Sequence, residues 1–217
     1  MNLEKENKQN LKSDLLPIWI YFGITVGASF ILGIIFAILK IELDMTIIQL
    51  IPQSLIFIVL IFLYYKRIKE DMLKITKKNL IFTIIISFIL ILLNFGISTL
   101  FEHLNVNMDN QNTLNDIFLK YKIFTTLDIV LFAPFIEEFV FRYSIGSAIE
   151  NKTIFLLLST FIFAIMHGVG VATILYIIIG FCLAYTYLKT NKNIVYPILI
   201  HILNNTFAVI TMFLALK

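Results

Sequence analysis

The chain has 217 residues, of which 59% are hydrophobic and only 14% are charged, and its formal net charge is +3. This apolar fraction exceeds the ~45–50% of an ordinary soluble domain and argues against a soluble core. Several apolar runs reach the ~20 residues that cross the hydrocarbon core of a bilayer. We therefore expect an all-α, polytopic transmembrane helical bundle that contacts the lipid bilayer and has no nucleic-acid partner.

The pattern of apolar runs predicts about seven membrane spans. In chain order they cover roughly residues 17–39, 45–65, 79–101, 124–144, 153–168, 171–189 and 194–215. The fifth span is short for a straight crossing. Two alternatives remain for it: a partly re-entrant segment, or a helix that begins below the membrane interface.

Basic residues indicate the orientation of the chain, because cytoplasmic loops are enriched in lysine and arginine. The loop after the second span carries six of them: Lys66, Arg67, Lys69, Lys74, Lys77 and Lys78. The N-terminal tail carries three: Lys5, Lys8 and Lys12. We therefore expect this loop and the N-terminus to be cytoplasmic. Abundant Ile, Lys, Asn and Phe suggest a low-GC bacterium, and hence a bacterial cell membrane.

The remaining loops follow from this orientation. The Asn-rich loop of 102–123 is expected outside, and its charges are Glu102, Asp109, Asp116, Lys120 and Lys122. Lys152, Lys189 and Lys192 then return to the inside, with the C-terminus outside. If the fifth span did not cross, Lys189 and Lys192 would face outside, so the positive charges favour a crossing.

The fourth span carries Glu137, Glu138 and Arg142 at positions that should lie in lipid. Each charge costs at least ~2.5–3.5 kcal/mol at the centre of a membrane helix, so the cluster predicts a functional site. Glu138 and Arg142 lie on one helix face, where an ion pair neutralises both. Glu137 points ~100° away and remains unpaired. A carboxylate in such a low dielectric is poised to take a proton from water.

Two neighbours bear on this segment. Pro134, one turn before Glu137, is expected to kink the helix and to open room for a solvent pocket. Asp128 lies near the outer end of the span, and we interpret it as interfacial. The alternative for the whole segment is a charge cluster that pairs helices or lines a pore.

Two later spans each contribute one histidine. His167 closes the fifth span, where an interfacial residue is as plausible as a catalytic one. His201 and Asn205 face the same way from the last span. They could form hydrogen bonds that hold neighbouring helices together. Alternatively they could be a donor pair for an oxyanion, since imidazole and carboxamide both donate. Asn204 points elsewhere and is expected to be a packing residue.

Together these groups predict a hydrolase whose nucleophile is water. Glu137 is the expected base and His167 the partner that orients the water. His201 and Asn205 are the expected oxyanion donors. No serine or cysteine is paired with a histidine in a recognisable nucleophile motif.

Three motifs, in this order, resemble the CAAX protease and bacteriocin-processing (CPBP, also called Abi) intramembrane endopeptidases. They are Glu137-Glu138-Phe-Val-Phe-Arg142, Phe163-Ala-Ile-Met-His167 and His201-Ile-Leu-Asn-Asn205. The resemblance covers about residues 124–210 and includes the similarity to type II CAAX prenyl endopeptidases.

The resemblance implies a glutamate-dependent intramembrane protease that needs no metal or other cofactor. It implies that Glu137 activates the water with help from His167. His201 and Asn205 would form the oxyanion hole. The supporting residues would be Glu138, Arg142 and Phe163.

The resemblance also implies a division of the chain and a class of substrate. The expected parts are a cytoplasmic tail at 1–16, N-terminal transmembrane helices and loops at 17–123, and a catalytic transmembrane core of four helices at 124–217. Members of this family trim prenylated CAAX proteins, and bacterial relatives are linked to bacteriocin maturation, self-immunity and peptide signalling. For a bacterial source we expect a peptide or membrane-protein substrate.

Three other functions remain open at this point. Glu137, His167 and His201 form an acceptable ligand set for a zinc-dependent membrane metalloprotease, although the chain has no His-Glu-x-x-His helix. A non-catalytic membrane immunity or interaction protein would use the same fold to bind a toxin or a receptor. A small transporter would use a carboxylate–histidine relay, but no internal repeat supports it. The oligomeric state is left open.

Depth in the membrane provides a test of the site. At 1.5 Å per residue from the inner face, Glu137 and His201 lie roughly 10–12 Å deep, whereas His167 lies near 20 Å. The three side chains can meet only if the fifth helix begins below the interface or is tilted.

Overall fold

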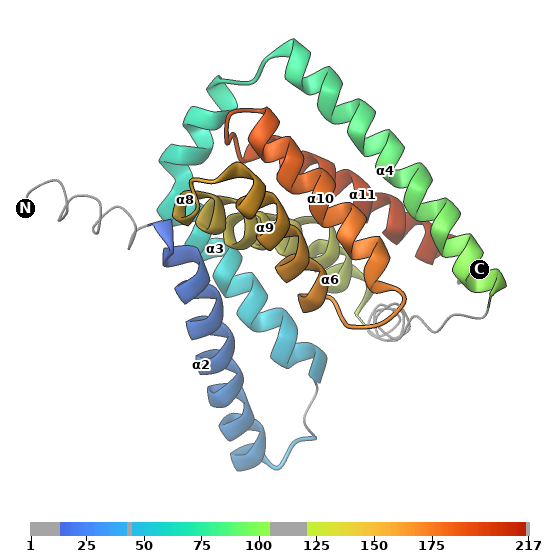
Figure 1. The fold of residues 1–217 in the computed structure, drawn as a ribbon. Helices are drawn as coiled ribbons and strands as arrows, with labels where there is room; N and C mark the ends of the chain where they lie inside the picture. Colours follow the sequence, from blue (N-terminus) through green and yellow to red (C-terminus); the bar gives the residue numbers. More distant parts are fainter. Residues whose placement is uncertain (1–13, 43–44, 105–120, 216–217) are drawn as a thin grey trace, which may run out of the picture.

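The computed structural model describes residues 14–42, 45–104 and 121–215, and these are mostly helical (Figure 1). Among these described helices, four are long and apolar enough to cross a membrane. They are α2 (Leu16–Leu39), α3 (Met45–Leu73), α4 (Lys77–His103) and α11 (Val195–Ala215). The expected all-α membrane helical bundle is confirmed.

Two shorter apolar helices, α9 (Lys152–Met166) and α10 (Thr173–Lys189), lie side by side in the middle of the bundle (Figure 1). With 15 residues, α9 extends only about 22 Å at 1.5 Å per residue. It is therefore shorter than the ~30 Å hydrocarbon core, as the sequence indicated for the fifth span. Its bounds differ from the predicted 153–168 by one or two residues at each end.

The prediction that a loop directly follows the second span is wrong, because α3 continues to Leu73 and includes Lys66, Arg67 and Lys69. Lysine and arginine are good helix formers, so the end of an apolar run does not require the end of a helix. The connection to α4 is therefore short, and Thr76 caps α4 by accepting a hydrogen bond from the backbone N–H of Asn79 at 3.3 Å.

The fourth predicted span is a helical segment that alternates between α-helix and π-helix. Its parts are α6 (Lys122–Leu127), η1 (Asp128–Phe132), α7 (Ala133–Glu137), η2 (Glu138–Ser144) and α8 (Ile145–Ala148), where η marks π-helix. Pro134 has no N–H to donate to the carbonyl four residues earlier. The disturbance expected at Pro134 thus appears as the π-helical segment that precedes it, where the N–H of Ala133 bonds to the carbonyl of Asp128. Such π-segments are frequent at functional sites.

The buried core lies where this segment packs against α3, α10 and α11. It is mainly aliphatic and aromatic, and its fully buried members include Ile56, Leu60, Leu90, Phe139, Phe155, Phe163, Leu183 and Tyr187. Large apolar side chains also cover the outside, among them Trp19, Phe30, Phe62 and Phe88. An apolar exterior around a packed interior is what a bundle in lipid requires.

One end of the bundle is held by polar contacts between distant segments. Arg67 donates to the carbonyl of Lys192 at 2.9 Å, and the Lys192 ammonium donates to the carbonyl of Gly146 at 2.6 Å. Asp71 accepts from Arg67 at 3.1 Å and from the backbone N–H of Ile194 at 3.0 Å. The two basic segments predicted to share one side of the membrane therefore lie together.

Some predictions concern residues that lie outside the described ones. These are the tail residues Lys5, Lys8 and Lys12, and the loop residues Asp109, Asp116 and Lys120.

Candidate active site

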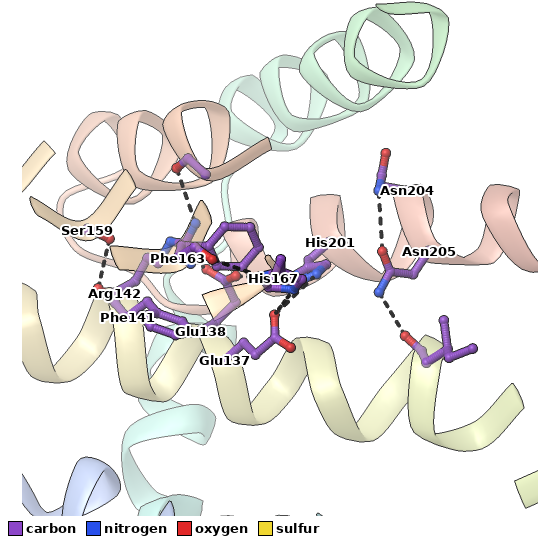
Figure 2. A network of polar contacts seen from close by, with 12 residues as sticks. Glu137, Glu138, Phe141, Arg142, Ser159, Phe163, His167, His201, Asn204 and Asn205 are labelled. Atoms are coloured by element: carbon purple, nitrogen blue, oxygen red, sulfur yellow. Dashed lines mark hydrogen bonds and ion pairs between the residues drawn. The ribbon is translucent and has the colours of Figure 1, made fainter. Parts of the chain in front are cut away.

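Three segments bring a carboxylate and two histidines together (Figure 2). Glu137 is the last residue of α7, His167 directly follows α9, and His201 lies in α11. Oε2 of Glu137 is 3.6 Å from Nε2 of His167 and 3.7 Å from Nε2 of His201. The depth calculated for His167 therefore does not keep it from the other two. The helix ends there because Gly168 adopts a φ of 124°, which favours glycine.

The carboxylate of Glu138 joins two basic side chains. Its Oε2 is 3.3 Å from Nε of Arg142, and its Oε1 is 2.9 Å from Nδ1 of His201. Arg142 also donates to the carbonyl of Gly180 at 3.1 Å. The side chains of Glu138 and Arg142 are 0% exposed. The predicted ion pair is thus present, and it fixes the ring of His201.

Phe163 packs at the centre of these groups. Its ring centroid is 4.3 Å from that of His167 and 5.8 Å from that of His201. The guanidinium carbon of Arg142 lies 4.5 Å from the same centroid, within cation–π range. Phe163 therefore packs against Arg142 and both histidines.

Hydrogen-bond partners indicate which ring nitrogens carry protons. A carbonyl oxygen can only accept, so Nδ1 of His167, at 2.8 Å from the carbonyl of Phe163, is the donor. In neutral His167 the Nε2 atom that faces Glu137 is then an acceptor. Nδ1 of His201 likewise donates to Glu138. Nε2 of His201 can therefore donate only when the ring is doubly protonated.

A chain of amide side chains links α4, α11 and η1. Nδ2 of Asn94 donates to Oδ1 of Asn204 at 2.7 Å, and Nδ2 of Asn204 donates to Oδ1 of Asn205 at 3.3 Å. Nδ2 of Asn205 in turn donates to the carbonyl of Ile129 at 2.8 Å (Figure 2). Asn204 is buried, as expected of a packing residue, but it does not point away from the site, because it lines the same cavity and donates to Asn205. Asn205 keeps a second N–H that this chain does not use.

These groups share one open cavity with a volume of about 1320 Å³. Its wall includes Glu137, His167, His201, Asn204 and Asn205. The structure therefore brings the four predicted catalytic residues to one cavity. Phe163 also lines it. Glu138 and Arg142 lie behind the wall and act on the cavity through His201.

Asp128 also lines this cavity, and its interpretation as interfacial is wrong. It is only 5% exposed, and its Oδ1 has no hydrogen-bond partner among the described residues. The π-helical winding that begins at Asp128 changes side-chain directions relative to an α-helix, which the sequence pattern did not reveal. Asn94 was overlooked as well. A lone asparagine in an apolar span needs an internal partner, and this signal could have identified it.

Comparisons with known proteins match this part of the chain. Residues 119–207 match the family described as "Type II CAAX prenyl endopeptidase Rce1-like". The predicted resemblance is confirmed. A stretch of 80 residues is 41% identical to the Bacillus subtilis (strain 168) protein named "Putative membrane peptidase YdiL". The matched stretch is 36% of this chain and 32% of that relative, so it spans about a third of each protein. No solved structure matches the chain.

Proposed function

We propose that this chain is an intramembrane endopeptidase that hydrolyses a peptide bond of a membrane-associated peptide or protein. The observation that carries the proposal is the gap of 3.6 Å between Oε2 of Glu137 and Nε2 of His167 at the cavity wall. Both atoms are acceptors when Glu137 is ionised and His167 is neutral. A water that donates one hydrogen to each presents its lone pairs to a substrate. The family match supports the reaction class.

The reaction begins when the water oxygen attacks the carbonyl carbon of the scissile bond and passes one proton to Glu137. His167 keeps the water oriented during the attack. The former carbonyl oxygen becomes an oxyanion, which His201 and Asn205 stabilise. The carbon–nitrogen bond then breaks, and the proton held by Glu137 passes to the leaving amine. The products are a carboxylic acid and an amine, and Glu137 is again the base.

The charges around the site support the role of His201. A donor at Nε2 requires the doubly protonated ring, because Nδ1 already donates to Glu138. With that ring charged, His201 and Arg142 balance Glu137 and Glu138. A buried cluster without net charge is less costly than one with an unpaired charge. The other donor is the free N–H of Asn205, whose amide plane is fixed by Asn204 and the carbonyl of Ile129.

We place the catalytic core at 124–217 and the end that carries Arg67 and Lys192 on the cytoplasmic side, as the distribution of basic residues favours. We also propose that the membrane is a bacterial cell membrane and that the N-terminus lies inside. The substrates proposed are bacteriocin precursors or signalling peptides, and self-immunity is a biological role consistent with them. The similarity to type II CAAX prenyl endopeptidases, over about 41% of the chain, supports the class of reaction and not the choice among these substrates.

A zinc-dependent peptidase would use Glu137, His167 and His201 as ligands. Among the described residues, no group of three or more His, Cys, Asp or Glu has the arrangement of a metal site. The metal requirement is decided by a chelator experiment. A non-catalytic immunity protein would use the same cavity without needing Glu137, which a single substitution distinguishes.

The test is cleavage of a library of apolar peptides in liposomes that contain wild type or Glu137→Gln, each with and without chelator. We expect wild type to cleave with or without chelator, and Glu137→Gln to be slower by about 10²–10⁴-fold. Glu150→Gln removes the same charge at an exposed position and should cleave as wild type does. Equal cleavage by wild type and Glu137→Gln would contradict the proposal, and inhibition by chelator would establish a metalloprotease.

A further inference from the structure

The cavity extends well beyond the atoms assigned to the reaction, and several carboxyl groups lie in its described wall. Three carboxyl groups line it: Glu102, Asp128 and Glu137. No lysine or arginine is among the described lining residues. The remaining polar wall includes the uncharged side chains of Gln49, Gln53 and Asn94.

Asp128 has no role in the proposed reaction, although it lies buried in the wall of the same cavity. It is only 5% exposed, it lines the cavity, and its Oδ1 has no hydrogen-bond partner among the described residues. A buried polar atom without a hydrogen bond loses its hydration with nothing in return, and the loss is greater if the group is charged. The chain of amides passes close by, at the carbonyl of Ile129, but supplies no donor to Asp128.

We infer that Asp128 binds a positively charged side chain, a lysine or an arginine, of the peptide that occupies the cavity. Occupation would give the buried carboxylate the partner that it lacks. Such a charge-assisted hydrogen bond is stronger than a neutral one. The inference rests on the proposed function only in treating the bound peptide as a substrate.

The position of Asp128 predicts where the positive charge lies relative to the cleaved bond. Asp128 and Glu137 both line the cavity from one helical segment. Their separation along the chain corresponds to roughly 10–13 Å at about 1.5 Å per residue or slightly less. An extended peptide covers about 3.3–3.6 Å per residue. The basic residue should therefore lie about three or four positions from the scissile bond.

Binding can be measured apart from cleavage in the Glu137→Gln protein, which should hold peptides without consuming them. The probes are acetylated, amidated apolar peptides of ten residues that carry a single lysine, moved through each position, with matched glutamine and glutamate versions. We expect the best lysine peptide to bind about tenfold or more tightly than its glutamine version, with the glutamate version weakest. Adding Asp128→Asn should remove this preference, whereas adding Glu150→Gln should not.

The outcomes separate this inference from the proposed function. Equal binding of lysine and glutamine peptides overturns the inference, as does a preference that survives Asp128→Asn. If Asp128→Asn does not fold, the charge-conserving Asp128→Glu must keep the preference, and its loss there also overturns the inference. Cleavage by Glu137→Gln at the wild-type rate would instead overturn the proposed function, while the binding preference would stand or fall by itself.

Discussion

Oε2 of Glu137 and Nε2 of His167 lie 3.6 Å apart, although the two residues end two different helices. The distance exceeds the ~2.7–3.2 Å of a direct hydrogen bond, so neither group satisfies the other. His201 completes the arrangement at 3.7 Å from the same oxygen. A carboxylate oxygen that lies beside two imidazoles without a direct hydrogen bond to either, on the wall of a cavity, is suited to hold a water.

The first prediction concerns His167. We expect His167→Gln to lower kcat by about 100-fold with little change in KM, since a misplaced water reacts slowly even when the substrate is bound. The measurement is steady-state peptide cleavage in liposomes. His103→Gln is the matched control, because His103 is exposed at the end of α4 and outside the cavity wall. An unchanged kcat in His167→Gln would remove His167 from the mechanism.

The second prediction concerns Asn205. Replacing Asn205 with leucine removes an oxyanion donor and should lower kcat by about 10²–10³-fold. Thr206→Val on the same helix is the control, because the hydroxyl of Thr206 donates to the carbonyl of Ile202 within its own helix. Asn94→Leu should have an intermediate effect. It removes the hydrogen bond that positions Asn204, which in turn donates to Asn205, but it leaves Asn205 itself unchanged. If Asn205→Leu is as active as Thr206→Val, Asn205 only joins neighbouring helices and does not donate to the oxyanion.

The third prediction concerns the buried ion pair. Arg142→Met leaves the carboxylate of Glu138 buried beside His201 alone, and should lower the free energy of unfolding by about 3–5 kcal/mol. The double variant Glu138→Gln/Arg142→Met removes both charges and should recover much of that loss. It should not recover activity, because His201 loses its charged acceptor. Stability is measured by unfolding in detergent. A double variant as unstable as the single one would show that packing of the arginine stem, and not charge, dominates.

The fourth prediction concerns the contact between α9 and α10. A Cβ atom at Gly180 would lie 3.1 Å from both the ring of Phe163 and the carbonyl of Thr160. Gly180→Val should therefore destabilise the protein by about 1–3 kcal/mol. It should also lower activity, since the carbonyl of Gly180 holds Arg142 and Phe163 packs on His167. Gly27→Val is the control, with nothing within 4 Å of its Cβ position. Equal thermal stability of the two variants would contradict the close packing.

Much of the site could be predicted because a charged or strongly polar residue is costly inside a membrane and therefore indicates a functional or structural role. Glu138 and Arg142 fall four positions apart on an apolar helix, and that spacing alone predicted their ion pair. The grouping of Glu137, His167 and His201 into one site followed from their being polar residues in apolar spans, and the resemblance supported it. Their separations in the sequence do not by themselves give the distances between the side chains. The simple depth calculation even argued against this grouping, since it assumed straight helices that start at the interface.

The corrections have different physical origins. Asp128 lies near the outer end of an apolar run, which indicates an interfacial position, but in the structure it lines the cavity at the start of a π-helical stretch. The contact between Asn204 and Asn94 joins helices that are far apart in the sequence, so the sequence alone does not reveal it. Lys66, Arg67 and Lys69 end an apolar run but continue the helix, because lysine and arginine are good helix formers.

The central claim is that water, activated by Glu137, is the nucleophile. The most direct measurement is a single turnover of wild type in ¹⁸O-labelled water with hydroxylamine present, followed by mass spectrometry of the products. Direct attack by water predicts one ¹⁸O atom in the new carboxyl terminus and no peptide hydroxamate. A covalent acyl-enzyme would be captured by hydroxylamine, so a hydroxamate product that disappears in Glu137→Gln would contradict the claim and make Glu137 the nucleophile.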